Sequence, residues 1–283
     1  MSTTQPTQQA VTAAACIIGD EILNGKTRDS NAHYLAKYLF NIGIDLKRVE
    51  IIGDDYNDIA ETITRLSSQH DLVFTSGGIG PTHDDITYEA IARAYSLPIE
   101  VDEETCQAME KVMLNRDSRW KMTDARKRMA IFPKPAKILR TCPDELWVPV
   151  VVVNDNIHIL PGIPRLFERL METMRDRFEQ MAVERGAGGR YYRVQVATRK
   201  PEGDIAVFLT ELQNRVAEQR IKIGSYPKWG KGPDGARVVI SIVGRDEDAI
   251  KSIGDEVLNG INGWLFDPVK KVDDQKNNIE ATQ

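Results

Sequence analysis

Three short apolar runs near the amino terminus each precede a segment with helical periodicity. The runs occupy residues 13–18, 44–52 and 72–74. Runs of this length are typical of buried strands, whereas apolar residues at i, i+4 and i+7 are typical of one helix face. These periodic residues are Leu35, Leu39 and Ile42 after the first run, Ile59, Ile63 and Leu66 after the second, and Ile86, Ala90, Ile91 and Ala94 after the third.

The alternation of strands and helices predicts an α/β fold built on a mainly parallel sheet. Successive βα units join parallel strands through right-handed crossovers, so the carboxyl ends of the three strands share one sheet edge. Ser30 is placed to cap the first helix and Gly43 to end it. Asp58 and Glu61 have capping-box spacing, which predicts the start of the second helix there.

The next segments predict a hairpin and a helix. Residues 148–153 and 157–160 are apolar strands, and the run Asn154-Asp155-Asn156 between them favours a tight turn. Residues 165–180 have a helical pattern, with Pro164 suited to the first turn.

Four methionines, Met109, Met113, Met122 and Met129, recur in the charged segment 100–130. Flexible thioether side chains fill irregular gaps in protein cores, so we interpret these residues as packing. The segment itself has a helical pattern.

The pattern changes after the glycine-rich segment 185–189, which we predict to be a linker. The order strand, helix, strand, strand, helix, strand is typical of a split βαβ fold. We therefore predict a first domain at residues 11–184 and a small α+β domain, ferredoxin-like or KH-like, at 190–268. The polar tails at 1–10 and 270–283 are expected to be disordered.

The candidate chemistry centres on the run Gly77-Gly78-Ile79-Gly80, which follows the third strand and precedes Asp84 and Asp85. Glycines between a strand and a helix let a ligand approach the backbone, and a helix start offers unpaired N–H groups to a phosphate. The two carboxylates would repel a phosphate unless a divalent cation lay between them. A tight turn with Asp84 or Asp85 as a helix cap is the alternative, because the loop has neither the Gly-Lys-Ser/Thr nor the Gly-x-Gly-x-x-Gly nucleotide fingerprint.

Acidic side chains also follow the first two strands, in Gly19-Asp20-Glu21 and Asp54-Asp55. Ligands of open α/β sheets bind outside the carboxyl ends of the strands. These acids should therefore meet Asp84 and Asp85 at one edge, although Asp54 or Asp55 could instead cap a helix. Carboxylates so close together require a cation or partial protonation.

Composition excludes several classes of function. The chain has 283 residues, 28% charged residues and a net charge of −5, which disfavours a nucleic-acid surface. Three cysteines without metal-ligand spacing indicate a reducing compartment. The first residues lack a signal-peptide pattern, and no apolar run is long enough to span a membrane, so we expect a cytoplasmic protein without membrane or nucleic-acid partners.

Four ordered motifs together resemble the MoaB/Mog family of molybdopterin-binding domains, in the branch typified by CinA. The likeness is greater to the amino-terminal domain of animal FAD synthase, and it extends from about residue 13 to 267. The motifs are Gly19-Asp20-Glu21-Ile22-Leu23-Asn24-Gly25 with Asn31, Gly53-Asp54-Asp55, Ser76-Gly77-Gly78-Ile79-Gly80-Pro81-Thr82-His83-Asp84-Asp85, and Pro161-Gly162-Ile163-Pro164, with Gly224-Ser225-Tyr226-Pro227-Lys228-Trp229-Gly230 as the further FAD-synthase-like run.

The resemblance implies a three-layer MoaB/Mog-like sandwich and a metal-dependent pyrophosphatase. Its substrate would be FAD, cleaved to FMN and AMP, or an ADP-ribose-like dinucleotide. The metal would be cobalt, magnesium or manganese, with assistance from potassium. The reductase-like domain of FAD synthase is not in these 283 residues, so FAD synthesis is not carried over. The run Pro143-Asp144-Glu145-Leu146-Trp147 replaces a small-residue loop of CinA, which leaves substrate choice open.

The predicted site follows from the residues and the resemblance together. Asp54, Asp84 and Asp85 are predicted to be catalytic and to hold the metal. Alternative functions are adenylyl transfer to molybdopterin and a non-catalytic flavin- or pterin-nucleotide-binding module, and we expect a homo-oligomer. The predicted substrate- and phosphate-binding residues are Gly19, Asp20, Glu21, Asn31, Thr75, Ser76, Gly77, Gly78, Gly80, Pro81, Thr82, Gly162, Tyr226 and Trp229.

Overall fold

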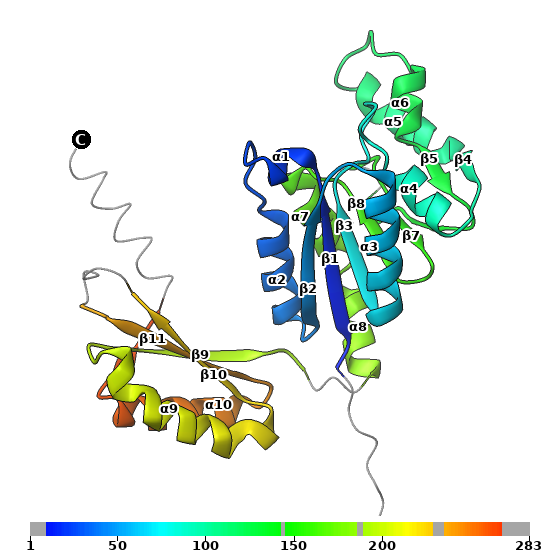
Figure 1. Ribbon diagram of the computed structural model, residues 1–283. Helices are drawn as coiled ribbons and strands as arrows, with labels where there is room; N and C mark the ends of the chain where they lie inside the picture. The colour runs from blue at the N-terminus through cyan, green and yellow to red at the C-terminus, as the bar shows by residue number, and fades with distance from the viewer. Residues whose placement is uncertain (1–9, 143–144, 186–188, 229–234, 268–283) are drawn as a thin grey trace, which may run out of the picture. The chain divides into compact units, whose positions relative to one another are not determined.

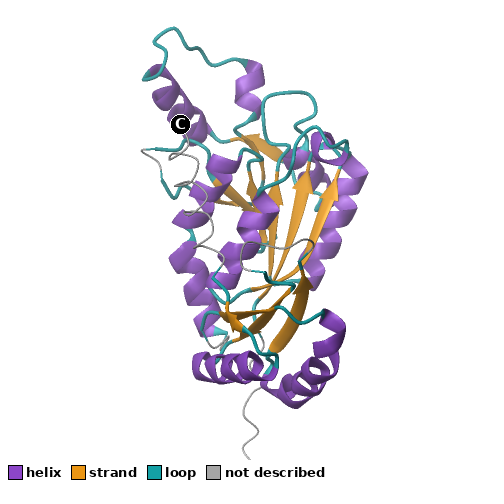
Figure 2. Cartoon of the chain, turned by 90° about the vertical axis from the view of Figure 1, so that its left-hand side faces the viewer, coloured by secondary structure: helices purple, strands orange, loops and turns teal. Residues whose placement is uncertain are grey.

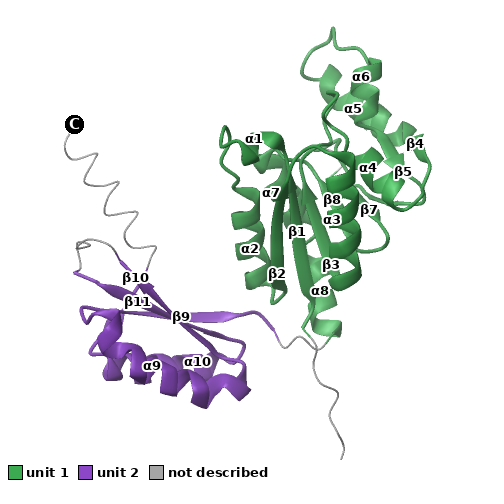
Figure 3. Cartoon of the chain, in the orientation of Figure 1, with its two compact units in different colours: residues 1–188 green, residues 189–283 purple. Residues whose placement is uncertain are grey.

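The computed structural model describes residues 10–142, 145–185, 189–228 and 235–267. The chain divides into two compact units, residues 1–188 and 189–283 (Figure 3). The tails predicted to be disordered lie outside the described residues, apart from residue 10. Trp229, a predicted ligand contact, also lies outside them.

Unit 1 is built on a six-stranded, mainly parallel sheet with the order β2-β1-β3-β8-β7-β6 (Figure 1). Strand β1 pairs in parallel with β2 and β3, and β3 pairs in parallel with β8. Strand β7 runs antiparallel to both of its neighbours. The strands are β1 (Thr12–Ile18), β2 (Asp45–Ile52), β3 (Leu72–Ser76), β6 (Lys137–Leu139), β7 (Val150–Val153) and β8 (Ile157–Leu160).

Helices cover both faces of this sheet, which confirms the predicted three layers (Figure 2). Side chains of a strand alternate between faces. Accordingly, Ala13 and Ala15 pack in one core with three helices, and Ala14 and Cys16 pack in a second core with two. The first group of helices is α2 (Asn31–Asn41), α7 (Pro164–Thr173) and α8 (Arg175–Glu184), and the second is α3 (Tyr56–Gln69) and α4 (Thr87–Ala94).

A helical insertion lies between two short strands that pair with each other, β4 (Ile99–Val101) and β5 (Ile131–Pro133). It contains α5 (Glu103–Leu114) and α6 (Asp124–Arg128). The four predicted packing methionines lie together in its small core, beside Cys106 and Trp120.

Three sequence-based predictions of helix boundaries are wrong. The cap of α3 is Asp55, whose carboxylate accepts the N–H groups of Asn57 and Asp58, so the capping box at Asp58 does not form. Helix α4 begins at Thr87 and has no side-chain cap, so the alternative in which Asp84 or Asp85 caps this helix is wrong. The helix predicted at 165–180 is interrupted at Met174, which separates α7 from α8.

Unit 2 has the predicted ferredoxin-like arrangement, with a four-stranded antiparallel sheet in the order β10-β11-β9-β12. Two helices pack on one face of this sheet through an aliphatic core. The elements are β9 (Tyr192–Thr198), α9 (Glu202–Val216), the short 3-10 helix η1 (Ala217–Gln219), β10 (Lys222–Pro227), β11 (Val238–Gly244), α10 (Glu247–Gly260) and β12 (Trp264–Leu265).

Two further expectations concern cysteines and membranes. All three cysteines are free thiols, and Cys16 and Cys106 are buried. In the described parts of the chain, no helix combines the length and the apolar character needed to cross a bilayer.

A buried histidine lies in the middle of the main sheet. His158 on β8 is 1% exposed and packs between the rings of Phe74 and Phe178, with ring centroids 5.3 and 5.4 Å away. Its Nδ1 donates to the carbonyl oxygen of Asn156 at 3.0 Å, and its Nε2 has no hydrogen-bond partner among the described residues. Burial lowers the pKa of His158 to about 4, because apolar surroundings disfavour the imidazolium.

Acidification should therefore destabilise the protein through His158. Its imidazole gains a proton near pH 6.5 when unfolded but only near pH 4 when folded, so stability present above pH 6.5 is lost between these values. The expected loss from pH 7 to pH 5 is about 2 kcal/mol in the free energy of unfolding. His158→Leu should remove this part of the pH dependence in chemical denaturation at both pH values. An unchanged dependence in the variant would contradict the assignment.

Candidate functional site

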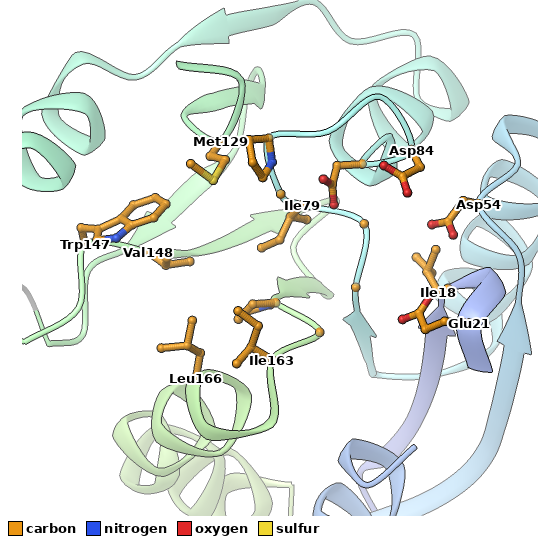
Figure 4. A pocket seen from close by; sticks show the side chains of 18 residues that line it. Ile18, Glu21, Asp54, Ile79, Asp84, Met129, Trp147, Val148, Ile163 and Leu166 are labelled. Atoms are coloured by element: carbon orange, nitrogen blue, oxygen red, sulfur yellow. The ribbon is translucent and has the colours of Figure 1, made fainter. Parts of the chain in front are cut away.

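A cavity of about 490 Å³ opens at the carboxyl edge of the parallel strands of unit 1 (Figure 4). We call it the rim cavity. Loops that follow β1, β2, β3 and β8 all contribute to it, as the predicted topology requires. Its lining residues are Ile18, Gly19, Glu21, Asp54, Gly77, Gly78, Ile79, Gly80, Pro81, Asp84, Asp85, Met129, Trp147, Val148, Pro161, Gly162, Ile163 and Leu166.

The glycine turn, residues 77–80, forms the middle of the rim cavity. Gly77 has φ +115°, and a Cβ at this position would lie 2.1 Å from the carbonyl oxygen of Ile18. Gly78 has φ +66°, and its Cβ would lie 2.2 Å from the hydroxyl of Thr87. Only glycine fits both the conformation and the space at these positions.

Two carbonyl groups of the turn are held by hydrogen bonds, whereas several of its N–H groups are unpaired. Thr87 donates its N–H to the carbonyl of Gly78 at 2.9 Å and its hydroxyl to the carbonyl of Gly77 at 3.0 Å. Within the described ranges, the N–H groups of Gly78, Ile79 and Gly80 have no hydrogen-bond partner. Successive unpaired backbone N–H groups are suited to binding an anion.

Asp20 and Asp54 hold the first two acidic loops together. The N–H of Asp20 donates to Oδ2 of Asp54 at 3.0 Å, and the N–H of Asp54 donates to Oδ1 of Asp20 at 3.4 Å. A Cβ on Gly53 would lie 2.5 Å from Oδ1 of Asp20, so the close approach depends on that glycine. Asp20 thereby supports Asp54 without lining the rim cavity itself.

The carboxylate of Asp54 lies in an acidic environment. Burial raises the pKa of Asp54, and the negative charges of Asp20, Glu21 and Asp84 raise it further, against the lowering effect of the Asp20 N–H. Figure 4 shows Glu21, Asp54 and Asp84 at the same end of the rim cavity. This end therefore favours a cation or a proton.

Asp85 supports the glycine turn as well as lining the cavity. Its Oδ2 accepts the N–H of Thr82 at 2.8 Å and the hydroxyl of Thr82 at 2.6 Å. The same oxygen would lie 2.5 Å from a Cβ on Gly80. No described residue donates to Oδ1 of Asp85, which leaves that oxygen available to a ligand.

Asn31 joins two of the cavity's loops from behind. It is 3% exposed, and its Nδ2 donates to the hydroxyl of Ser76 and to the carbonyl of Gly162, both at 2.8 Å. It therefore positions the glycine loops and does not itself line the cavity. Thr75, beside Ser76, is fully buried, and its hydroxyl has no partner in the described structure.

The structure brings most of the predicted site residues together, with some differences in role. Gly19, Glu21, Asp54, Gly77, Gly78, Gly80, Pro81, Asp84, Asp85 and Gly162 line the rim cavity, whereas Asp20, Asn31, Thr75, Ser76 and Thr82 do not. Tyr226 lies in unit 2, where its ring rests on Gly224 and is 58% exposed.

Sequence reasoning missed the apolar end of the cavity. Trp147 follows β6 in a loop, and Met129 ends the helical insertion, so neither shares a strand register or a helix face with the glycine turn. The one signal in the sequence was the replacement of a small-residue loop by a segment containing Trp147.

Comparisons with known proteins give a consistent picture. The family described as "Probable molybdopterin binding domain" matches residues 14–180, and "FAD synthase, middle domain" matches residues 190–270. The chain is 31% identical over 238 residues to the "Probable FAD synthase" of Caenorhabditis briggsae, covering 79% of this chain but 45% of that protein. It is also 31% identical over 236 residues to a protein of Archaeoglobus fulgidus, covering 83% of this chain and 91% of that protein.

A solved structure shares the fold of unit 1. The crystal structure of "the protein CinA with unknown function" from Thermoplasma acidophilum is 28% identical, with a TM-score of 0.53. The match covers 60% of this chain and 98% of that one.

The backbone contact at Gly77 should be far less tolerant of a side chain than a glycine in open space. Gly25 offers a matched control, because it has φ +76° but no atom lies within 4 Å of the place that a Cβ would take. We expect Gly25→Ala to cost about 1 kcal/mol of unfolding free energy, from the conformation alone. Gly77→Ala should cost at least about 3 kcal/mol, since the methyl meets a backbone oxygen. Equal unfolding midpoints for the two variants in urea would contradict this contact.

Proposed function

Because the chain belongs to the family of the probable molybdopterin binding domain, in its CinA-type branch, we propose that it hydrolyses a dinucleotide at its phosphoanhydride. The favoured substrate is FAD, with FMN and AMP as products, and ADP-ribose-like dinucleotides are the related class. The similarity to proteins named FAD synthase supports a flavin nucleotide. One structural observation carries the proposal, namely that residues with unpaired backbone N–H groups line the same cavity as the carboxylates of Asp54, Asp84 and Asp85.

The glycine turn suits the diphosphate of such a substrate. Its unpaired N–H groups at Gly78, Ile79 and Gly80 can donate to phosphate oxygens without displacing an internal hydrogen bond. They are held in place before the ligand arrives, so they need no reorganisation when negative charge develops during cleavage. Gly162 approaches Gly77 so closely that its Cβ would lie 3.2 Å from the Gly77 Cα, which keeps the cavity floor free of side chains.

The acidic end fits a divalent cation. Hard cations such as magnesium bind through one or two carboxylates and the phosphate oxygens of the substrate, so a complete protein cage is not required. The described residues contain no group of three or more His, Cys, Asp or Glu side chains arranged as such a cage. The three predicted ligands, Asp54, Asp84 and Asp85, would therefore reach a cation through only one or two of their carboxylates, together with phosphate oxygens of the substrate. When bound, the cation would supply charge neutralisation and Lewis acidity.

Each part of the site then has one role in the reaction. Water adds to one phosphorus, the bridging P–O bond breaks, and the leaving phosphate takes the electron pair of that bond. The proton released from water passes to solvent. Asp54 and Asp84 would hold a cation that, when bound, would neutralise charge on the diphosphate, and the glycine turn would orient the phosphates for attack.

Asp54→Asn should abolish most of the turnover while leaving the fold intact. The amide can still accept the N–H of Asp20 but cannot supply negative charge, so we expect FMN release from FAD to fall by about a hundredfold or more. Asp55→Asn is the matched control, because Asp55 caps α3, does not line the cavity, and asparagine is an equally good cap.

The measurement is chromatographic detection of FMN and AMP with and without divalent metal and potassium. Turnover that is equal in the two variants would overturn the role of Asp54. Tight FAD binding without products in the unmodified protein, unaffected by chelator, would instead support a binding module.

The pH dependence of turnover should reflect the raised pKa of Asp54. Burial and neighbouring carboxylates keep a larger fraction of Asp54 protonated than an ordinary aspartate at the same pH, so activity should fall on the acid side earlier than usual. Protons and the cation compete for this carboxylate. Raising the magnesium concentration should therefore shift the acid limb of the kcat/KM profile to lower pH. An acid limb that does not change with magnesium concentration would contradict competition between protons and the cation for Asp54.

A further inference from the structure

The rim cavity has two chemically different ends (Figure 4). The carboxylates of Glu21 and Asp54 lie at one end, and Trp147 lies at the other, beyond the glycine turn. A diphosphate and its cation need only the first end and the turn, so the apolar end is left for another part of the ligand. Its side chains are those of Met129, Trp147, Val148, Ile163 and Leu166.

Trp147 is anchored in place by its neighbours in the loop. Leu146 and Val148, on either side of it, pack against the main core of unit 1. Glu145 forms an ion pair with Arg169 on α7 at 2.8 Å. The indole is half-buried and packs against the methionine-rich core of the helical insertion. Part of the indole is therefore supported by packing while the residue still lines the cavity.

We propose that Trp147 is a specificity-determining residue that contacts the isoalloxazine ring of a flavin nucleotide whose phosphate binds at the glycine turn. The proposal rests on the function proposed above. A flat ring against an indole gains both apolar burial and favourable ring contact. The polarizable sulfur of Met129, which also lines this end, adds a favourable contact to an aromatic ring.

The chemistry of the apolar end favours the flavin ring over adenine. Among the five side chains there, the indole N–H of Trp147 is the single polar group, and it is a donor. The dimethylbenzene edge of isoalloxazine matches such a surface. The exocyclic amine of adenine needs an acceptor, and burying it without one is unfavourable.

The test measures binding of the two products separately, since FMN carries the flavin ring and AMP carries adenine. Neither product contains the phosphoanhydride, so binding is independent of hydrolysis. Dissociation constants for FMN and AMP would be measured by flavin fluorescence and equilibrium dialysis for the full chain with magnesium. The variants are Trp147→Ala, Trp147→Phe, Trp147→Met and, as a control, Trp120→Phe, which alters another indole of the same methionine-rich core that does not line the cavity.

We expect Trp147→Ala to weaken FMN binding by about tenfold or more and to leave AMP binding unchanged, because ring stacking contributes on this scale. Trp147→Phe should retain most FMN affinity, and Trp120→Phe should retain all of it. Trp147→Met keeps apolar volume but removes the ring, so it should weaken FMN binding even if the alanine variant proves unstable in a thermal melt.

Three results would overturn the proposal. These are an equal loss of FMN and AMP affinity in Trp147→Ala, an unchanged FMN affinity in the methionine variant, and a loss in Trp120→Phe that exceeds the loss at Trp147. Failure of the proposed reaction is seen separately. If the protein binds FMN through Trp147 but releases no FMN from FAD, the proposed ring contact is supported and the proposed hydrolysis is contradicted.

Discussion

The rim cavity depends on the close approach of three backbone segments where no side chain intervenes. A Cβ on Gly77 would lie 2.1 Å from the carbonyl oxygen of Ile18, which is too close, and a Cβ on Gly162 would lie 3.2 Å from the Gly77 Cα, which is a tight contact. This contact brings the loops after β1, β3 and β8 to one level at the sheet edge. Asn31 then fixes two of the loops from behind, through Ser76 and Gly162. The amide donors and the carboxylates are near each other because the backbone segments that carry them are packed closely together.

The same geometry collects negative charge that the fold alone does not neutralise. The carboxylates of Asp20 and Asp54 each accept a hydrogen bond from the backbone N–H of the other residue. These bonds satisfy two carboxylate oxygens but add no positive charge. The raised pKa of Asp54 shows that its ionised form is disfavoured here. Asp84 at the same end of the cavity differs, because a hydrogen bond from Thr82 lowers the pKa of its carboxyl. A cation bound beside Asp54 would therefore stabilise the ionised form of that carboxylate.

Local pattern and topology made much of this predictable. Apolar runs indicated the strands of the main sheet, and the parallel connections between them were enough to place the acidic loops on one edge. Helix starts were harder, because Asp55 and Asp58 are both capable caps and the choice depends on where the chain leaves β2. Trp147 was harder still. Its place opposite the glycine turn is set by the packing of a loop against two separate cores, and no periodicity in the sequence reports that packing.

The core that supports Trp147 belongs to a segment separate from the main sheet, whose loops carry Asp54, Asp84 and Asp85. The insertion between β4 and β5 has its own small core, rich in methionine, and contributes Met129 to the cavity. Such a core accepts changes of shape more readily than one built of branched residues. If Trp147 contacts the flavin ring as proposed, substitutions in this insertion would alter ring preference without changing the glycine turn. The insertion that carries Met129 and the glycine turn at the sheet edge are thus separate segments, and one can change without the other.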